Sequence, residues 1–192
     1  MLTDGNYKQA AEELGCEVAA ILAVISVESA GDGFLPDGRP KILFEAHIFH
    51  RYTKGRFDTT HPHLSSPTWN RKLYKGGAGE YDRLEEAISL DRRAAIMSAS
   101  WGAFQIMGFN LAGCGFTNVE DFVAAMRASE RRQLEAFIEF IKSQHLDDEL
   151  RQRDWATFAR IYNGPSYKAN RYDEKPAKAY AKFKEEHDER DT

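Results

Sequence analysis

The stretch AILAVISVESAGDG, residues 20–33, is aliphatic until Glu28 and ends in two glycines. Its apolar side chains recur at helical spacing and also cover the opposite face. A surface helix keeps one face polar, so this pattern predicts a buried helix over residues 17–29. Gly31 and Gly33 favour a turn of the chain directly after it. We therefore expect this helix to lie at the centre of the fold.

Glu28 stands at the carboxyl end of that helix. Burial disfavours the charged form of a carboxyl, and the negative end of the helix dipole does the same, so both effects predict a raised pKa for Glu28. A carboxyl that stays protonated near neutral pH can act as a general acid, for instance on a glycosidic oxygen. A solvated helix end or a structural ion pair would also place a glutamate here.

The remaining chain is expected to form further helices around one irregular segment, residues 33–79. Helical patterns occur at about 7–14, in two pieces across 80–100, after an N-cap at Asn118, along 134–141 and 155–162, and from Pro176 as the first helical residue. The irregular segment is rich in proline, glycine and histidine, and KILF (residues 41–44) is its strand candidate, in a small hairpin. The prediction is a mainly α, α+β fold: one domain over residues 1–192 with a small β-containing lobe beside a cleft.

Composition argues against several classes of protein. A chain of 192 residues with 42% hydrophobic residues can bury one core, and a net charge of −4 without a basic block does not favour nucleic-acid binding. No stretch resembles a membrane span or an export signal, so we expect a product made in the cytoplasm and not inserted in a membrane. Cys16 and Cys114 are far apart and are expected to be buried thiols, not a disulfide.

Cofactor-binding patterns are weak. Four histidines fall in one segment, namely His47, His50, His61 and His63. They lack the HExxH spacing and accompanying cysteines, so no metal site is expected. KGGAGEY (residues 75–81) follows no strand, which argues against a nucleotide site, and the serines of SASW (residues 98–101) stand in no nucleophile elbow.

Three motifs in chain order carry a resemblance to a known family. AVISVESAG (residues 23–31), SASWGAFQIMG (98–108) and RIYNGPSY (160–167) resemble the three motifs of the goose-type lysozyme and lytic transglycosylase superfamily. More closely, GFLPDGRPKILFEAHIFHR (33–51), SASWGAFQIMGFN (98–110) and DWATFARIYNGP (154–165) resemble the phage-associated N-acetylmuramidases, which are endolysins. The resemblance extends from about Tyr7 to Tyr180.

This resemblance implies a lysozyme-like fold and a cofactor-free enzyme that cuts the β-1,4 bond between N-acetylmuramic acid and N-acetylglucosamine in peptidoglycan. It implies that Glu28 is the acid and that Gln105 and Ile106 line the sugar cleft. It also implies that Tyr162 and Asn163 face the glutamate and contact substrate. Independently of the resemblance, Tyr162 completes an apolar helical stripe and is expected to be part of the core.

A second carboxylate is needed if water is to be activated or an oxocarbenium ion stabilised by charge. The candidates are Asp32, Asp37, Glu45 and Asp58. Glu45 is preferred because it follows the strand candidate and shares a face with Leu43 under period-two alternation. An ion pair that holds the lobe to the helices is the alternative role for Glu45.

Three other functions remain open. A lytic transglycosylase would use a single acid/base glutamate, whereas a non-catalytic glycan-binding protein would need no buried acid at Glu28. A helical nucleic-acid or partner-binding domain is disfavoured by the acidic balance, although Arg127, Arg131 and Arg132 form a small basic patch. As an endolysin, the chain is expected to be a monomer without a separate wall-binding module, reaching the wall in the periplasm through a membrane lesion made by another protein.

Overall fold

A computed structural model describes residues 2–28, 32–162, 168 and 171–188. The described helices are α1 (Asp4–Leu14), α2 (Val18–Glu28), α3 (Ala46–Thr53), α4 (Gly79–Leu90), α5 (Arg92–Met97), α6 (Val119–Ala128), α7 (Glu130–Ser143), α8 (Asp147–Gln152), α9 (Trp155–Tyr162) and α10 (Glu174–Asp188). The strands are β1 (Ile42–Phe44), β2 (Ala99–Trp101) and β3 (Ile106–Met107), and two 3-10 turns are η1 (Arg71–Leu73) and η2 (Gly108–Asn110).

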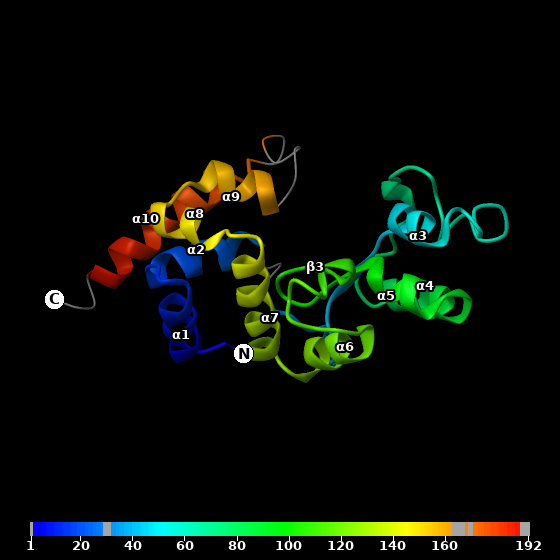
Figure 1. Cartoon of the computed structure of the whole chain (residues 1–192), viewed down its shortest axis with the longest axis horizontal. Coiled ribbons are helices and arrows are strands. Elements are labelled where there is room, and N and C mark those ends of the chain that lie inside the picture. Colours follow the sequence, from blue (N-terminus) through cyan, green and yellow to red (C-terminus); the bar gives the residue numbers. More distant parts are fainter. Residues whose placement is uncertain (1, 29–31, 163–167, 169–170, 189–192) are drawn as a thin grey trace.

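Helix α2 is the centre of one group of helices, as its all-round apolar pattern predicts. Helices α1, α8 and α10 pack around it, and in Figure 1 these elements lie together with α9 on one side of the molecule. Ile21, Val24 and Ile25 are all buried in the core. The preceding helix α1 begins with a capping box at Thr3 and ends at Gly15, which has a left-handed backbone (φ 65°) that suits glycine.

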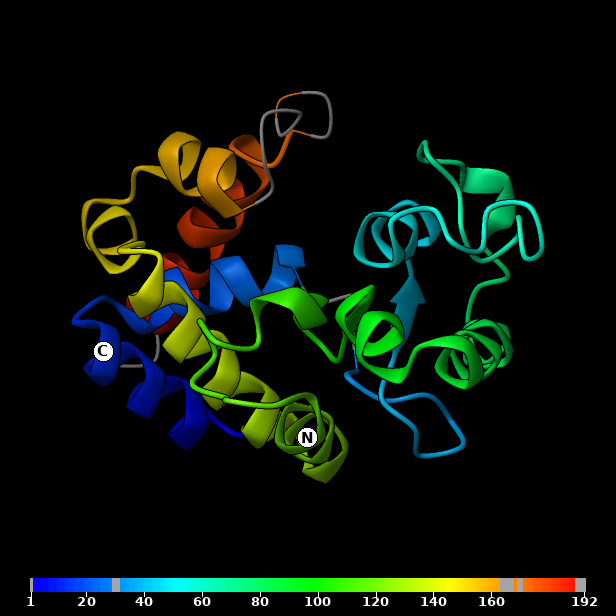
Figure 2. The ribbon, with the colours of Figure 1, turned by 45° about the vertical axis from the view of Figure 1, so that its right-hand side comes forward.

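The second group contains α3, α4 and α5, which lie on the other side of the molecule in Figures 1 and 2. Helices α3 and α4 both contact α5, and α4 also packs against β1. Strand β1 joins an antiparallel sheet of order β1-β2-β3, in which Leu43 pairs with Ser100 and Trp101 pairs with Ile106. The tight connection from β2 to β3 begins at Gly102, which has a φ of 70°.

Helix α7 connects the two groups, because it packs against α1 of the first group and against α6, which in turn contacts α5 of the second group. Its buried Gln133 donates a hydrogen bond to the Met126 carbonyl and accepts one from the Ala103 backbone N–H, both at 2.8 Å. A Cβ atom on Gly33 or Gly102 would lie within 2.6 Å of the Gln133 side chain. The amide of Gln133 therefore fixes the β2–β3 turn against the helical group.

Several predicted elements are confirmed, and others are corrected. Asn118 caps α6 as expected, accepting the Asp121 N–H at 2.9 Å. The prediction that helix continues to residue 100 is wrong, because residues 99–101 form β2, a fully buried strand without the alternation that would reveal it. The last helix begins at Glu174 and not at Pro176, since a proline anywhere in the first helical turn leaves no hydrogen bond unmade.

The segment 33–79 is more ordered than its composition suggests. It contains α3 and η1, and its proposed hairpin is an isolated bridge between Phe34 and Pro40, while β1 finds its partner strand outside the segment. Cys16 and Cys114 are both free thiols; Cys114 is buried and Cys16 is half-buried. In the part of the chain that the structure describes, each helix is too short or too polar to cross a membrane.

Candidate active site

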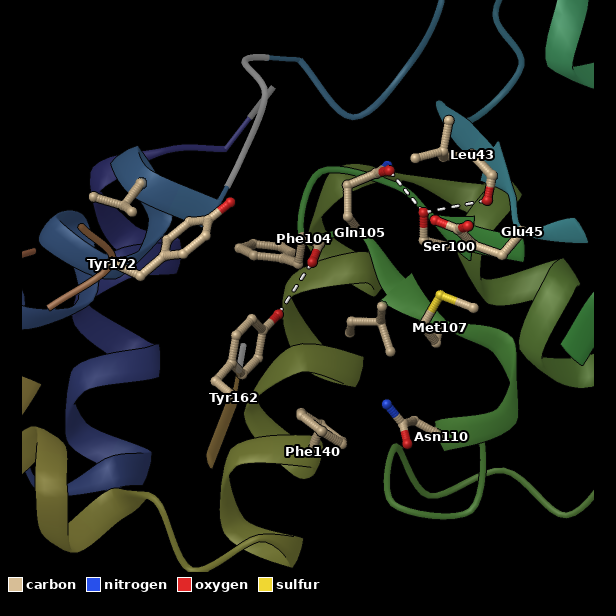
Figure 3. Close-up of a pocket in the computed structure, with 12 residues that line it drawn as sticks. Leu43, Glu45, Ser100, Phe104, Gln105, Met107, Asn110, Phe140, Tyr162 and Tyr172 are labelled. Carbon is tan, nitrogen blue, oxygen red and sulfur yellow. Dashed lines mark hydrogen bonds between the residues drawn. The ribbon is translucent and has the colours of Figure 1, made fainter. Parts of the chain in front are cut away.

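A pocket of about 580 Å³ opens where the two groups of helices meet the sheet (Figure 3). Its lining comes from α2, the sheet and its hairpin, α7, α9 and the segment before α10. The lining residues are Val27, Leu43, Glu45, Ser100, Phe104, Gln105, Ile106, Met107, Asn110, Phe140, Tyr162 and Tyr172. Segments from both ends of the chain therefore converge on one cavity.

Glu28 is the last residue of α2, and its side chain lies outside the described part of the structure. The residue before it, Val27, lines the pocket. The carboxyl end of α2 therefore reaches the pocket, with the negative end of its dipole toward this region.

Glu45 lies directly after β1, at the N-cap position of α3. Its side chain makes no capping hydrogen bond, and its carboxylate instead accepts the Tyr74 hydroxyl at 2.6 Å. His47 Nδ1 lies 3.3 Å from the same Oε2 atom, and the Glu45 side chain is 16% exposed. Leu43 also lines the pocket, so the predicted sharing of one face by Leu43 and Glu45 agrees with the structure. The positive end of the α3 dipole lies at Glu45.

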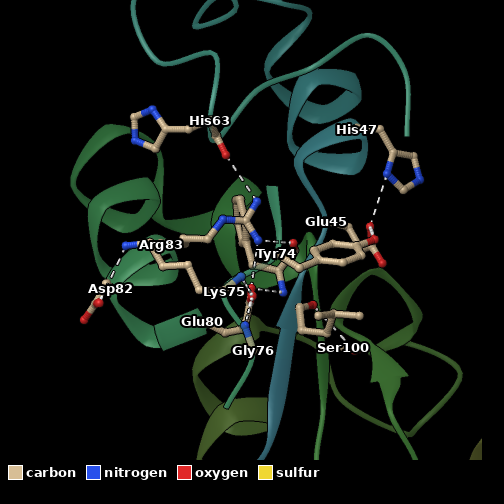
Figure 4. Close-up of polar contacts among 12 residues, drawn as sticks. Glu45, His47, His63, Tyr74, Lys75, Gly76, Glu80, Asp82, Arg83 and Ser100 are labelled. Carbon is tan, nitrogen blue, oxygen red and sulfur yellow. Dashed lines mark hydrogen bonds and ion pairs between the residues drawn. The ribbon is translucent and has the colours of Figure 1, made fainter. Parts of the chain in front are cut away.

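Tyr74 orients the Glu45 carboxylate (Figure 4). Burial first, and then the hydrogen bond to Glu45, raise the pKa of Tyr74 well above its usual range. The phenol is therefore neutral at physiological pH and donates its proton to the carboxylate. Its oxygen in turn accepts the indole N–H of Trp69 at 2.7 Å.

Gln105 lines the pocket from the connection between β2 and β3, with a left-handed backbone (φ 47°). Its Oε1 accepts the Ser100 hydroxyl at 2.8 Å, and its Nε2 donates to the Gly102 carbonyl at 2.9 Å. These bonds hold the amide in place beside the cavity (Figure 3). Ile106 in β3 adds an apolar wall. The Ser100 hydroxyl faces two acceptors, Gln105 Oε1 and the Leu43 carbonyl, so its role here is to hold the Gln105 amide in position.

Tyr162, the last residue of α9, is half-buried, packs against the core and also lines the pocket. Its ring stacks on Phe158 with centroids 5.6 Å apart and meets Phe137 and Phe140 edge to face. Its hydroxyl donates to the Phe104 carbonyl at 3.1 Å, beside the pocket. The next predicted site residue, Asn163, lies outside the described residues.

The other three candidates for the second carboxylate do not line the pocket. Asp32 is exposed, and Asp37 pairs with Arg39 at 2.7 Å. Asp58 lies 2.9 Å from His50 Nδ1. Asp37 and Asp58 therefore each contact a neighbouring side chain of their own segment and not the pocket. Of the four candidates, Glu45 is thus the one that the structure brings to the cavity.

Three of the four histidines in residues 33–79 contact separate carboxylates, whereas His61 Nδ1 lies 2.9 Å from the Thr60 hydroxyl. His47 lies next to Glu45, and His63 lies 3.0 Å from Glu86. Among residues 2–28, 32–162, 168 and 171–188, no three metal-binding side chains come together in a way that could hold an ion.

Some pocket residues were missed by sequence reasoning. The missed residues that line the cavity are Met107, Asn110, Phe140 and Tyr172. Tyr74 was also missed; it does not line the cavity but hydrogen-bonds to Glu45, which does. Phe140 lies on the apolar side of a recognisable helix, but nothing local in the sequence distinguishes a core aromatic from one at a cavity wall. Tyr74 lies 29 positions from Glu45 and carries no periodic signal.

A mainly helical fold with a small three-stranded sheet, and a pocket between them that holds a carboxylate, defines a lysozyme-like glycoside hydrolase. The family model for N-acetylmuramidase matches residues 17–184. The crystal structure of an endolysin from Burkholderia AP3 phage is similar, with 41% identity and a TM-score of 0.89 over 96% of this chain and 72% of that chain. No curated protein matches. The chain belongs to the N-acetylmuramidase family, glycoside hydrolases that act on peptidoglycan, which confirms the resemblance of its motifs and the predicted fold class.

Proposed function

We propose that the chain is an endolysin-type muramidase that hydrolyses the β-1,4 bond between N-acetylmuramic acid and N-acetylglucosamine, with Glu28 and Glu45 as its two carboxyl groups. The observation that carries this proposal is that Glu45 lines the pocket. Its carboxylate is oriented by a hydrogen bond from Tyr74 and makes no capping hydrogen bond to α3. The similar phage protein is an endolysin, which supports a role in lysis.

The two glutamates have opposite relations to helix dipoles, which suits an acid and a base. Glu28 ends α2, where the dipole disfavours a negative charge and so favours the protonated form. Glu45 precedes α3 and therefore lies at the positive end of that helix dipole. Glu28 would therefore protonate the leaving glycosidic oxygen, while Glu45 would activate water or stabilise the positive charge that develops on the sugar ring.

Four residues are proposed to bind the sugar rings. Gln105 and Ile106 line the pocket at the sheet, and Tyr162 faces it from α9. Asn163 follows Tyr162 directly in the chain, and its role is carried by the motif resemblance. Gln105 has both ends of its amide hydrogen-bonded, so its contribution is a fixed polar wall that costs little ordering on binding.

We also propose that residues 1–192 form one catalytic domain that acts as a monomer. The pocket combines α2 with α9 and with the sheet, so parts from both ends of the chain are needed to build it. The enzyme would be made in the cytoplasm and would act on periplasmic peptidoglycan once another protein has opened the membrane. Size-exclusion chromatography of the active protein with light scattering would measure the monomer mass.

A lytic transglycosylase is the second candidate, because it shares the fold and needs only Glu28. Glu45 at the pocket favours hydrolysis, since transglycosylation requires no second carboxylate. The test is mass spectrometry of purified peptidoglycan after digestion. Hydrated reducing ends support the proposed hydrolase, whereas anhydro-muramic ends would establish transglycosylation. A protein that binds the glycan and releases no product would be a non-catalytic binder.

A further inference from the structure

Trp69 is exposed yet held in place. Its side chain is 59% exposed, more than the other exposed large hydrophobic residues of the described chain, Tyr52 and Ile161. Its indole N–H donates to the Tyr74 hydroxyl at 2.7 Å, and the two rings meet at 67° with centroids 6.4 Å apart. One edge of the indole is therefore anchored while much of its surface faces solvent.

The anchor connects Trp69 to the candidate active site. Tyr74 is the shared partner, because its hydroxyl accepts from Trp69 and donates to Glu45 Oε2 at 2.6 Å. Figure 3 shows Glu45 at the opposite end of the pocket from Tyr162 and Tyr172, and Figure 4 shows Tyr74 against Glu45 in the lobe. The indole thus lies next to the lobe end of the pocket, two hydrogen bonds from the proposed base.

We propose that Trp69 is a stacking platform for a sugar ring of the glycan strand, beyond Glu45 on the lobe side of the bond that is cut. A polymeric substrate that enters the pocket must continue over its rim. The C–H groups on the face of a pyranose carry partial positive charge and are attracted to the negative face of an indole. Because Tyr74 already fixes the ring, stacking on it costs little conformational entropy. This inference rests on the proposed function, since it places the same substrate on the lobe.

A platform outside the reacting bond supplies binding that is equal in the ground state and the transition state, so its loss raises KM more than it lowers kcat. Its effect also requires a strand long enough to reach it. Both features separate stacking from a structural role behind Glu45, which would lower kcat on fragments of any length.

The experiment uses soluble, peptide-free glycan fragments of increasing defined length with wild type, Trp69→Ala and Trp69→Phe. We expect kcat/KM of the wild type to rise with fragment length. On the long fragments, kcat/KM of Trp69→Ala should be about tenfold lower than that of the wild type, mainly through a higher KM. Trp69→Phe, which keeps a ring, should recover most of it. Tyr52→Ala is the matched control, since Tyr52 is an exposed aromatic on α3 that packs near Phe109 and does not line the pocket.

Tryptophan fluorescence provides a readout that does not depend on turnover. The chain has three tryptophans, and Trp101 and Trp155 are buried, so a spectral shift on adding long fragments to the Glu28→Gln protein reports on Trp69. A shift that disappears in Glu28→Gln/Trp69→Phe supports the platform, even if wild type proves to release no product and the proposed function fails. The absence of a shift, or a Trp69→Ala loss in kcat that is the same at every length, overturns it.

Discussion

Glu80 and Arg83, both in α4, form a buried ion pair, with 2.8 Å between Arg83 Nη1 and Glu80 Oε2 and side chains that are 1% or less exposed. Glu80 also accepts the backbone N–H groups of Phe44, Lys75 and Gly76, and Arg83 donates to the Phe44 carbonyl (Figure 4). The pair therefore ties the end of β1 to the segment that follows Tyr74. It holds in register the two chain segments that bring Tyr74 to Glu45.

Arg83→Met should destabilise the protein strongly, because it leaves the Glu80 carboxylate buried without its counter-charge. Breaking one partner of a buried pair costs about 3–5 kcal/mol of unfolding free energy. Urea denaturation measures that loss. Arg92→Met is the matched control, since the Arg92–Glu120 pair is exposed and should contribute little to stability. Equal losses in both variants would show that burial does not set the contribution of the pair.

Glu28→Gln should retain the fold and lose about 100-fold to 10,000-fold in rate, because the amide keeps the shape of the side chain but cannot supply the proton. Release of soluble glycan fragments, together with the circular dichroism spectrum, checks both halves of this expectation. Glu12→Gln is the control, because Glu12 is exposed on α1 and does not line the pocket. A folded Glu28→Gln enzyme with a near wild-type rate would refute the assignment of the acid.

Glu45→Gln should also lower the rate, and it should change the shape of the pH profile. A hydrolase with one protonated and one ionised carboxyl has a bell-shaped profile, with apparent values that belong to the pair. Removing the group that must be ionised should abolish the acidic limb of the residual activity and leave the basic limb. The assay needs soluble fragments at constant ionic strength, because changes in wall solubility distort lysis measurements.

Asp37→Asn is the control for that experiment, because Asp37 is an exposed carboxylate of the same lobe that pairs with Arg39 away from the pocket. It should keep the full bell. A fully active Glu45→Gln enzyme with an unchanged profile would mean that Glu45 only holds the lobe in place.

Cys114→Ala should cost about 1 kcal/mol of stability at neutral pH through the void it leaves, with no change in cleavage products.

Burial raises the pKa of the Cys114 thiol to about 12. In the unfolded chain a thiol ionises near pH 8.5, so stability from the neutral buried thiol is complete below that pH and is lost as pH rises toward 12. Urea unfolding at pH 8 and about pH 10 should therefore show a smaller decline for Cys114→Ala than for wild type. An equal decline would show that this thiol does not contribute, and lost turnover in a folded variant would point to a chemical role.

Local signals in the sequence predicted much of the fold. The all-round apolar pattern of α2 predicted a central helix, and Asn118 and Gly15 marked helix ends, because capping and the 3.6-residue period involve only neighbouring residues. The ordered motifs predicted the family, and alternation after β1 selected Glu45 from four carboxylates as the one at the pocket.

Contacts between distant segments were decided only by the tertiary structure. Strands β2 and β3 are three and two residues long and are mostly buried, so they lack a periodic signal. Strand β2 forms because β1 pairs with residues about 57 positions away, and β3 then pairs with β2. The hydrogen bonds from Trp69 to Tyr74 and from Tyr74 to Glu45 depend on the path of an irregular segment that Glu80 and Arg83 hold in place. Side-chain types and local spacing set the helices, whereas the orientation of a carboxylate depends on which remote donor the packed chain brings within hydrogen-bond distance.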